Sequence, residues 1–272
     1  MAEQHHQPRP DDGAAQDRYV GGQDLTRWRT PIGRAAVRIA QRISRQLGPH
    51  TALVLILLLG ATAAVLLTAL TGEVYESVVE ADGVAMLDHP LLQAAMGLRS
   101  PGLDAAVTGF TNLAGTVGMP VLAGLAMLVL SLTRRSWMPV VLIATAGGGS
   151  LLMTLAGKHL TGRTRPPLAD AVPPYEYSAS FPSGHSLNSV VVAGIVAYVL
   201  VLRQHTLRAR VLTVLAAAVF AVAVGLSRVF LGHHWFTDVL GAWTLGLAWL
   251  SLVITAHRLY LTVRHRGTQS RT

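Results

Sequence analysis

The chain has 272 residues, of which 51% are hydrophobic and only 13% are charged, and its mean hydropathy is +0.44. One soluble core does not need so much apolar surface, so the composition favours a membrane protein. The net charge of +8 suits either nucleic acid or an anionic membrane surface, and the hydrophobicity favours the membrane over nucleic acid as partner. The absence of cysteine excludes disulfides, zinc-thiolate sites and a thiol nucleophile.

The first 50 residues are polar and basic. Residues 1–30 are rich in Pro, Gly, Asp and Gln and lack an apolar pattern, which predicts a disordered cytoplasmic tail. They show no cleavable signal peptide, so membrane insertion should depend on the first span. Residues 31–50 place four arginines at helical spacing, which predicts a basic juxtamembrane helix or, with equal weight, a solvated basic flank. These arginines are Arg34, Arg38, Arg42 and Arg45.

Apolar stretches long enough to cross a bilayer follow from residue 51 onward. We predict an all-α fold, a polytopic membrane helix bundle with about six transmembrane spans. The bundle should occupy residues 51–260 and be followed by a basic cytoplasmic tail over residues 261–272. The clearest windows are 51–70, 137–156, 209–226 and 237–256, and two less distinct ones lie at 115–132 and 186–202.

The distribution of basic residues predicts the orientation of the spans. Arg134, Arg135 and Arg203, with the basic pieces at both ends, fall on one side of a six-span arrangement, and cytoplasmic loops carry the excess of Lys and Arg. Both termini should then be cytoplasmic in a cell membrane of inner or plasma type. The opposite side should receive residues 71–114, 158–185 and 227–236, and the first of these is a candidate lid or substrate contact.

Three short segments on the predicted outer side hold the residues able to do chemistry. They follow or precede spans, so the fold should bring them to one membrane face. Their order is a Lys followed by Arg-Pro, then Pro-Ser-Gly-His, then Ser-Arg with a later His and Asp. The residues are Lys158, Arg165 and Pro166, then Pro182, Ser183, Gly184 and His185, then Ser227, Arg228, His234 and Asp238.

This ordered set resembles the type 2 phosphatidic acid phosphatase family, which also includes vanadium haloperoxidases and glucose-6-phosphatase. The resemblance extends over residues 158–238, and the expected spans agree with the family's membrane lipid phosphatase branch. It implies a phosphomonoesterase or diphosphatase, and a membrane-embedded member implies a lipid-borne substrate. The soluble haloperoxidase reading is disfavoured because those members lack spans.

The same residues form a coherent site for phosphoryl transfer. Lys158, Arg165 and Arg228 are candidate phosphate-binding cations. Ser183 and the Gly184 amide are further phosphate-binding candidates, since they should lie at a helix N-terminus, where unpaired N–H groups favour an anion. No metal or other cofactor is needed in this scheme.

Two histidines and one aspartate are the candidate catalytic residues. A histidine nucleophile must be neutral, and Asp238 follows His234 by four residues, which would place both on one helical face. We therefore expect His234 to accept the phosphoryl group, Asp238 to orient it, and His185 to act as general acid and then as general base. A metal site of two His and one Asp is the alternative, and the three nearby cations disfavour it.

The remaining conspicuous residues have simpler interpretations. Arg163 is expected to be a topology signal or a snorkelling side chain, and His159, His233 and His257 to be structural. The run Gly147–Gly149 lies within a span and favours close helix packing over nucleotide binding.

The predicted function is hydrolysis of a lipid phosphate at the outer membrane face through a phosphohistidine. Candidate substrates are undecaprenyl and other polyprenyl diphosphates, phosphatidic acid and phosphatidylglycerol phosphate, and the first of these is favoured at this stage. A lipid phosphotransferase that passes the phosphoryl group to a hydroxyl is the alternative enzyme class. A transporter or structural membrane protein is disfavoured because the predicted spans contain almost no charge.

Overall fold

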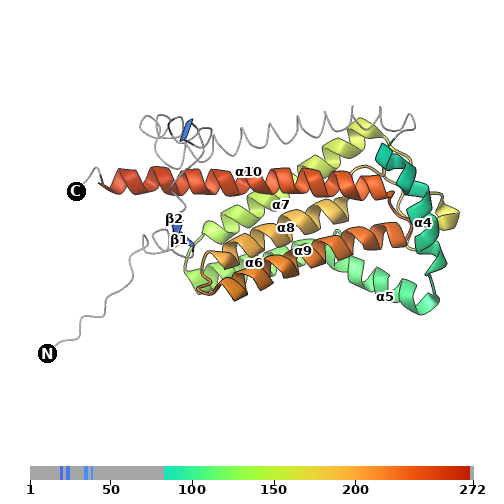
Figure 1. The fold of residues 1–272 in the computed structure, drawn as a ribbon, viewed down its shortest axis with the longest axis horizontal. Helices are drawn as coiled ribbons and strands as arrows, with labels where there is room; N and C mark the ends of the chain where they lie inside the picture. The colour runs from blue at the N-terminus through green and yellow to red at the C-terminus, as the bar shows by residue number, and fades with distance from the viewer. Residues whose placement is uncertain (1–18, 21–22, 25–33, 36–37, 39–82, 270–272) are drawn as a thin grey trace.

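The computed structural model describes residues 19–20, 23–24, 34–35, 38 and 83–269 (Figure 1). Most of the expected tail, basic helix and first span at 51–70 lies outside the described residues. Within the tail, β1 (Tyr19–Val20) and β2 (Gln23–Asp24) form one short antiparallel pair. From residue 83 onward the described elements are helices, namely η1 (Gly83–Leu87), α4 (Asp88–Gly97), α5 (Pro101–Thr111), η2 (Asn112–Ala114), α6 (Gly118–Arg134), α7 (Met138–Thr161), η3 (Leu168–Asp170), α8 (Gly184–Val201), α9 (Leu207–Phe230) and α10 (Phe236–Gln269).

The predicted all-α membrane bundle is confirmed. Among the described residues, four helices are long and apolar enough to cross a membrane, namely Met138–Thr161, Gly184–Val201, Leu207–Phe230 and Phe236–Thr262. A fifth candidate is a bent pair, Pro101–Ala114 with Gly118–Arg134, whose two parts meet at 49°. The described part of the chain thus contains four candidate spans, or five with the bent pair, and the first expected span, 51–70, lies outside it.

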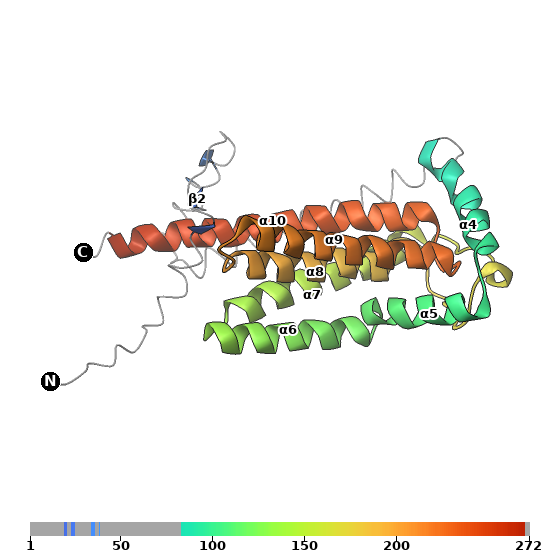
Figure 2. The same cartoon turned by 60° about the horizontal axis from the view of Figure 1, so that its bottom comes forward.

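Helix α8 lies at the centre of the bundle, against α7, α9 and α10 (Figures 1 and 2). Its apolar residues Leu187, Val191 and Ile195 are completely buried and lie on one face, four residues apart. That face contacts Ile143 of α7 and Trp249 of α10, which belong to the same apolar cluster. A helix that is apolar on nearly all sides is expected at such a central position.

The glycine run of α7 allows close contact between two helices, as the sequence indicated. A Cβ at Gly149 would lie 2.2 Å from the Trp249 ring, so only glycine leaves room for this tryptophan. The indole Nε1 then donates to the Ala146 carbonyl at 2.9 Å. Gly148 has no such neighbour within 4 Å. Packing against α10 therefore depends on one glycine of the three.

One end of the bundle gathers the segments that carry the candidate site. The C-terminal ends of α7 and α9 and the N-terminal ends of α8 and α10 meet there, and α4 lies beside them (Figures 1 and 2). The basic turns after α6 and α8 lie at the opposite end. Residues 83–114 were expected as part of an outer loop, but they form η1, α4, α5 and η2. The start of α5 is stabilised by Ser100, which caps the helix, and by Pro101 at its first position.

Candidate active site

The structure brings all eight predicted site residues to the same end of the bundle. Lys158 lies in the last turn of α7, and Arg228 lies in the last turn of α9. Ser183 caps α8, which begins at Gly184 and His185. His234 lies in the turn after α9, and Asp238 lies in the first turn of α10. Arg165 lies in the segment that follows α7. Because the other residues are at or next to helix ends, their positions are fixed by how the bundle packs.

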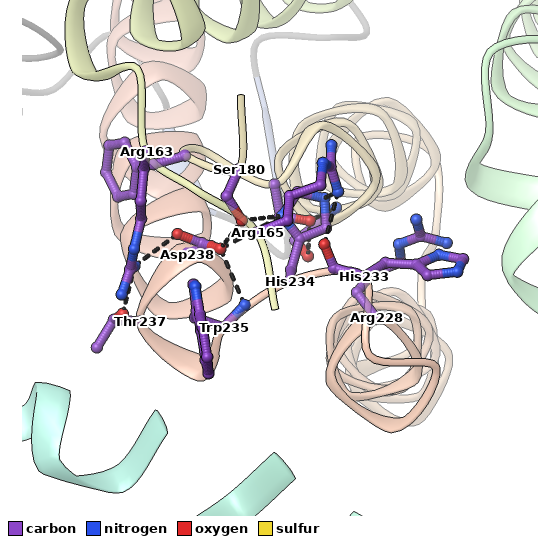
Figure 3. Close-up of polar contacts among 12 residues, drawn as sticks. Arg163, Arg165, Ser180, Arg228, His233, His234, Trp235, Thr237 and Asp238 are labelled. Atoms are coloured by element: carbon purple, nitrogen blue, oxygen red, sulfur yellow. Dashed lines mark hydrogen bonds and ion pairs between the residues drawn. The ribbon is translucent and has the colours of Figure 1, made fainter. Parts of the chain in front are cut away.

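His234 and Asp238 form a buried pair (Figure 3). The Nδ1 atom of His234 lies 3.4 Å from Oδ2 of Asp238, and the two residues are 1% and 0% exposed. Helical spacing does not create this contact, since α10 begins only at Phe236. The turn between α9 and α10 instead folds back so that Asp238 Oδ2 also accepts from the Trp235 amide at 2.9 Å.

Two further side chains orient Asp238. Ser180 donates its hydroxyl to Oδ2 of Asp238, and Ser180 Oγ is also 3.5 Å from Nδ1 of His234. Arg163 donates from Nη1 to Oδ1 of Asp238 at 2.6 Å. The interpretation of Arg163 as a snorkelling side chain was therefore wrong, because its side chain is only 10% exposed and is paired with buried carboxylates.

Three cations lie near the Nε2 edge of the His234 ring. Arg165 places Nη1 3.2 Å from Nε2 of His234 and donates to the His233 carbonyl at 2.6 Å. Arg228 is 2% exposed, and its Nε has no partner within the described part of the chain. Lys158 donates from Nζ to Ser178 Oγ at 2.9 Å. Nε2 of His234 therefore faces fixed positive charge.

Glu176, which the sequence analysis missed, lies among these cations. Its carboxylate pairs with Arg165 at 2.8 Å and with Arg228. Its Oε2 atom is 3.9 Å from Nε2 of His234. Burial raises the pKa of Glu176, but Arg228 and the other neighbouring cations outweigh this effect and lower the pKa to about 2. An ionised carboxylate thus occupies the position where an anion would meet His234.

The surroundings of His234 favour its neutral form. Burial lowers the pKa of His234 well below its ordinary value, and Arg165 and Arg228 lower it further. Because the Asp238 carboxylate lies on the Nδ1 side, it favours a proton on Nδ1, which leaves Nε2 with a lone pair. A neutral imidazole of this tautomer can attack an electrophile on the cationic side.

The N-terminus of α8 contributes backbone groups beside this site. The Ser183 hydroxyl accepts from the Ser186 amide at 3.4 Å, so it serves as the helix cap. A Cβ at Gly184 would lie 3.1 Å from Thr154, which shows how closely α8 approaches α7. His185 follows in the first turn, and a Cβ at Gly115 would lie 3.3 Å from its Nε2 atom. The break between α5 and α6 therefore adjoins His185.

The other histidines and Ser227 have contacts that fit structural roles. His233 places Nε2 2.7 Å from the Val172 carbonyl, and burial together with Arg228 lowers its pKa. His257 pairs with the Tyr198 hydroxyl at 2.9 Å, far along α10, and His159 is exposed. Ser227 links α9 to α5 by donating to Thr111 Oγ1 at 3.0 Å.

Together these features define a helical membrane protein with a cation-lined site around a neutral histidine. The chain belongs to the PAP2 superfamily, whose sequence model matches residues 121–260. It is 35% identical over 179 residues to phosphatidylglycerophosphatase B of Bacillus subtilis (strain 168), a match that covers 64% of this chain and 85% of that protein.

A solved structure is similar along most of the chain. It is the crystal structure described as the first transmembrane PAP2 type phosphatidylglycerolphosphate phosphatase from Bacillus subtilis. The TM-score is 0.60 at 31% sequence identity, and the match covers 75% of this chain and 93% of that one. The family resemblance read from residues 158–238 is thereby confirmed, and the similarity reaches well beyond them.

Proposed function

We propose that this protein is a membrane phosphatase that hydrolyses a lipid phosphate through a phosphohistidine on His234. The observation that carries the proposal is the arrangement at Nε2 of His234. This nitrogen faces Arg165 at 3.2 Å, while Nδ1 on the other edge of the ring faces Asp238 at 3.4 Å. A nucleophile with a lone pair toward an anion-binding site and an oriented tautomer is what attack on phosphorus requires.

Three cations would hold the phosphoryl group in this scheme. Arg165 and Arg228 would contact its oxygens in place of the Glu176 carboxylate that they bind here. Lys158 would add a third positive charge, and the Gly184 amide at the start of α8 would add a backbone donor. Ser183 would hold the N-terminal end of α8 in place by capping it. The protein's own cations would neutralise the negative charge that develops on the phosphoryl oxygens in the transition state.

His185 would handle the protons of the two half-reactions. In the first, Nε2 of His234 bonds to phosphorus while the bond to the leaving oxygen breaks, and His185 gives that oxygen a proton. In the second, His185 takes a proton from water, whose oxygen bonds to phosphorus and releases phosphate from His234. Its place in the first turn of α8, beside the break at Gly115, puts it at the edge of the site.

We propose phosphatidylglycerol phosphate as the first substrate to test, ahead of phosphatidic acid and the polyprenyl diphosphates. The relatives reported above carry this activity in their names, and they favour it over the undecaprenyl diphosphate that the sequence alone put first. The site would lie on the extracytoplasmic face, since the basic turns with Arg134 and Arg203 lie at the opposite end of the bundle.

A panel assay tests this proposal. Purified protein in detergent should release inorganic phosphate from phosphatidylglycerol phosphate, retain activity in EDTA and be inhibited by vanadate, which imitates five-coordinate phosphorus. The His234→Ala variant should be inactive. Free phosphate release, measured against transfer to added lipid or sugar hydroxyls, separates the phosphatase from a phosphotransferase. Activity that is lost on chelation and returns with Mg or Zn would contradict the metal-independent mechanism.

A further inference from the structure

A buried carboxylate outside the residues matched by the family model reaches the candidate catalytic pair. Asp88 begins α4, before the matched residues 121–260, and it is 4% exposed. Its Oδ2 atom accepts from Arg163 Nη2 at 2.8 Å. Arg163 uses its other terminal nitrogen, Nη1, to bind Asp238 at 2.6 Å. A chain of alternating charges therefore runs from α4 to the carboxylate beside His234.

The same carboxylate also holds the start of α10. Asp88 Oδ1 accepts from the Thr237 amide at 2.9 Å, and Oδ2 accepts from the Thr237 hydroxyl at 2.8 Å. The Thr237 amide is one of the N–H groups that a helix leaves without an internal partner at its beginning. Asp88 thus caps α10 from another helix, one residue before Asp238.

Arg163 joins these two groups in a fixed geometry. Its Nη1 atom donates to both Asp238 Oδ1 and Thr237 Oγ1, the latter at 2.7 Å (Figure 3). The planar guanidinium turns Nη2 toward Asp88. With Oδ1 held by Arg163, the Asp238 carboxylate directs Oδ2 to Ser180, the Trp235 amide and His234. The orientation of Oδ2 therefore depends on where Arg163 is held.

We infer that Asp88 is a positioning residue for the reaction, which acts through Arg163 on Asp238 and so on His234. This inference rests on the proposed function of His234. The geometry supports it, because Asp88 binds Nη2 of Arg163 while Asp238 binds Nη1, so the positive charge of Arg163 is shared between two buried carboxylates. Without Asp88, Arg163 would lose the carboxylate that holds its Nη2 atom, and the Asp238 carboxylate would be less firmly oriented toward the His234 ring.

The test is a double-mutant cycle on kcat. Asp88→Asn keeps the side-chain shape and removes the charge. It should lower kcat by about 10- to 100-fold, a loss of the size seen when a residue that orients a functional side chain by hydrogen bonding is replaced. KM and the Ki of inorganic phosphate should stay unchanged, since Arg165, Arg228 and Lys158 are untouched. Arg163→Gln should have a similar effect, and the double variant should be no slower than Arg163→Gln alone.

Matched variants separate positioning from loss of folding. Asp104→Asn removes an acid from the first turn of the neighbouring helix α5 and should keep wild-type kcat. Arg163→Lys, which retains the charge, should recover part of the activity lost in Arg163→Gln. Thermal unfolding in detergent identifies any variant that has lost its fold. If Asp88→Asn or Arg163→Gln does not fold, the kcat of Arg163→Lys relative to wild type tests whether the position of the Arg163 side chain affects the reaction.

The outcomes are distinct. Wild-type kcat in Asp88→Asn, or independent losses that multiply in the double variant, would overturn the inference while leaving the proposed function intact. A raised KM or phosphate Ki without a change in kcat would assign Asp88 to substrate binding and would also overturn it. If wild-type protein releases no phosphate from any lipid while its fold is intact, the proposed function itself fails.

Discussion

At the scale of single residues, the site is a set of charges that satisfy one another in the absence of substrate. Arg165 and Arg228 bind Glu176, and Arg163 binds Asp88 and Asp238. Burying an unpaired charge is costly, so each buried cation of the site needs an anion nearby. Under the proposed function, a substrate phosphate would displace the Glu176 carboxylate from Arg165 and Arg228.

Replacing Glu176 with Gln should strengthen phosphate binding. The amide keeps the shape but no longer competes as an anion, so the Ki of inorganic phosphate should fall by about threefold to fivefold, the size expected for a partly exposed ion pair. Inhibition of aryl phosphate hydrolysis measures this Ki. Asp170→Asn, a change of the same charge on the same connecting segment, serves as the control. A higher Ki in Glu176→Gln would mean that Glu176 assists binding.

Alanine variants of the three histidines near the site should differ in turnover and in how much phosphoprotein accumulates. With an aryl phosphate, whose leaving group needs little protonation, His185→Ala should still form a phosphohistidine but hydrolyse it slowly, so acid-labile phosphoprotein should accumulate. His234→Ala should form none. His233→Ala should keep most of the turnover, because His233 contacts the Val172 carbonyl. Normal turnover in His234→Ala with none in His233→Ala would transfer the nucleophile to His233.

Residues of the site differ in how readily the sequence reveals them. Lys158, Arg165 and Arg228 stand at fixed spacings within three ordered motifs, so one chain suffices to find them. Arg163 and Glu176 have no such signal, because their partners are far away in the chain, as in the pair of Arg163 with Asp88. An arginine beside a span is usually a topology signal, and only the fold shows which one pairs with a buried acid.

At the scale of helices, the apolar windows predicted where the helices lie better than where they begin and end. The windows 209–226 and 237–256 fall within α9 and α10, and the window 137–156 begins one residue before α7. Helix α6 differs, since its 17 residues reach only about 26 Å and pass as a span only together with Pro101–Ala114. The sequence did not predict that α5 and α6 together form one bent candidate span, because a polar, glycine-containing stretch around Gly115 separates them.

The contact between α7 and α10 gives a test at the same scale. Gly149→Ala places a methyl group against Trp249, and overpacking of this kind costs about 1–3 kcal/mol. We expect a lower unfolding temperature in detergent. Gly148→Ala, one residue earlier with open space around it, should be neutral or slightly stabilising because alanine favours a helix. Equal effects of the two changes would show that the steric contact is not what matters.

At the scale of the whole molecule, the two ends of the bundle have different chemistry. One end holds the site, and the other holds the basic turns with Arg134, Arg135 and Arg203. The positions of the basic residues between the apolar windows predicted this asymmetry. Which helices lie side by side, with α8 in the middle, could not be predicted, since an apolar helix is compatible with several neighbours.

The asymmetry predicts which positions are accessible from outside the cell. Since the native chain has no cysteine, Tyr177→Cys at the site end should react in intact cells with an impermeant thiol reagent, and Thr206→Cys at the other end should react only after lysis. Tyr177 is 82% exposed, so its labelling should not depend on unfolding. Labelling in the reverse pattern would place the site in the cytoplasm.

The segment before α8 has a further consequence. Glu176, Ser178 and Ser180 occupy every second position, and each reaches a different part of the site, namely the arginines, Lys158 and Asp238. Tyr177, between the first two, points into solvent. A single inserted or deleted residue here would move these side chains away from their partners. The geometry of the proposed site therefore depends on the length of this short piece of chain as well as on the side chains that it carries.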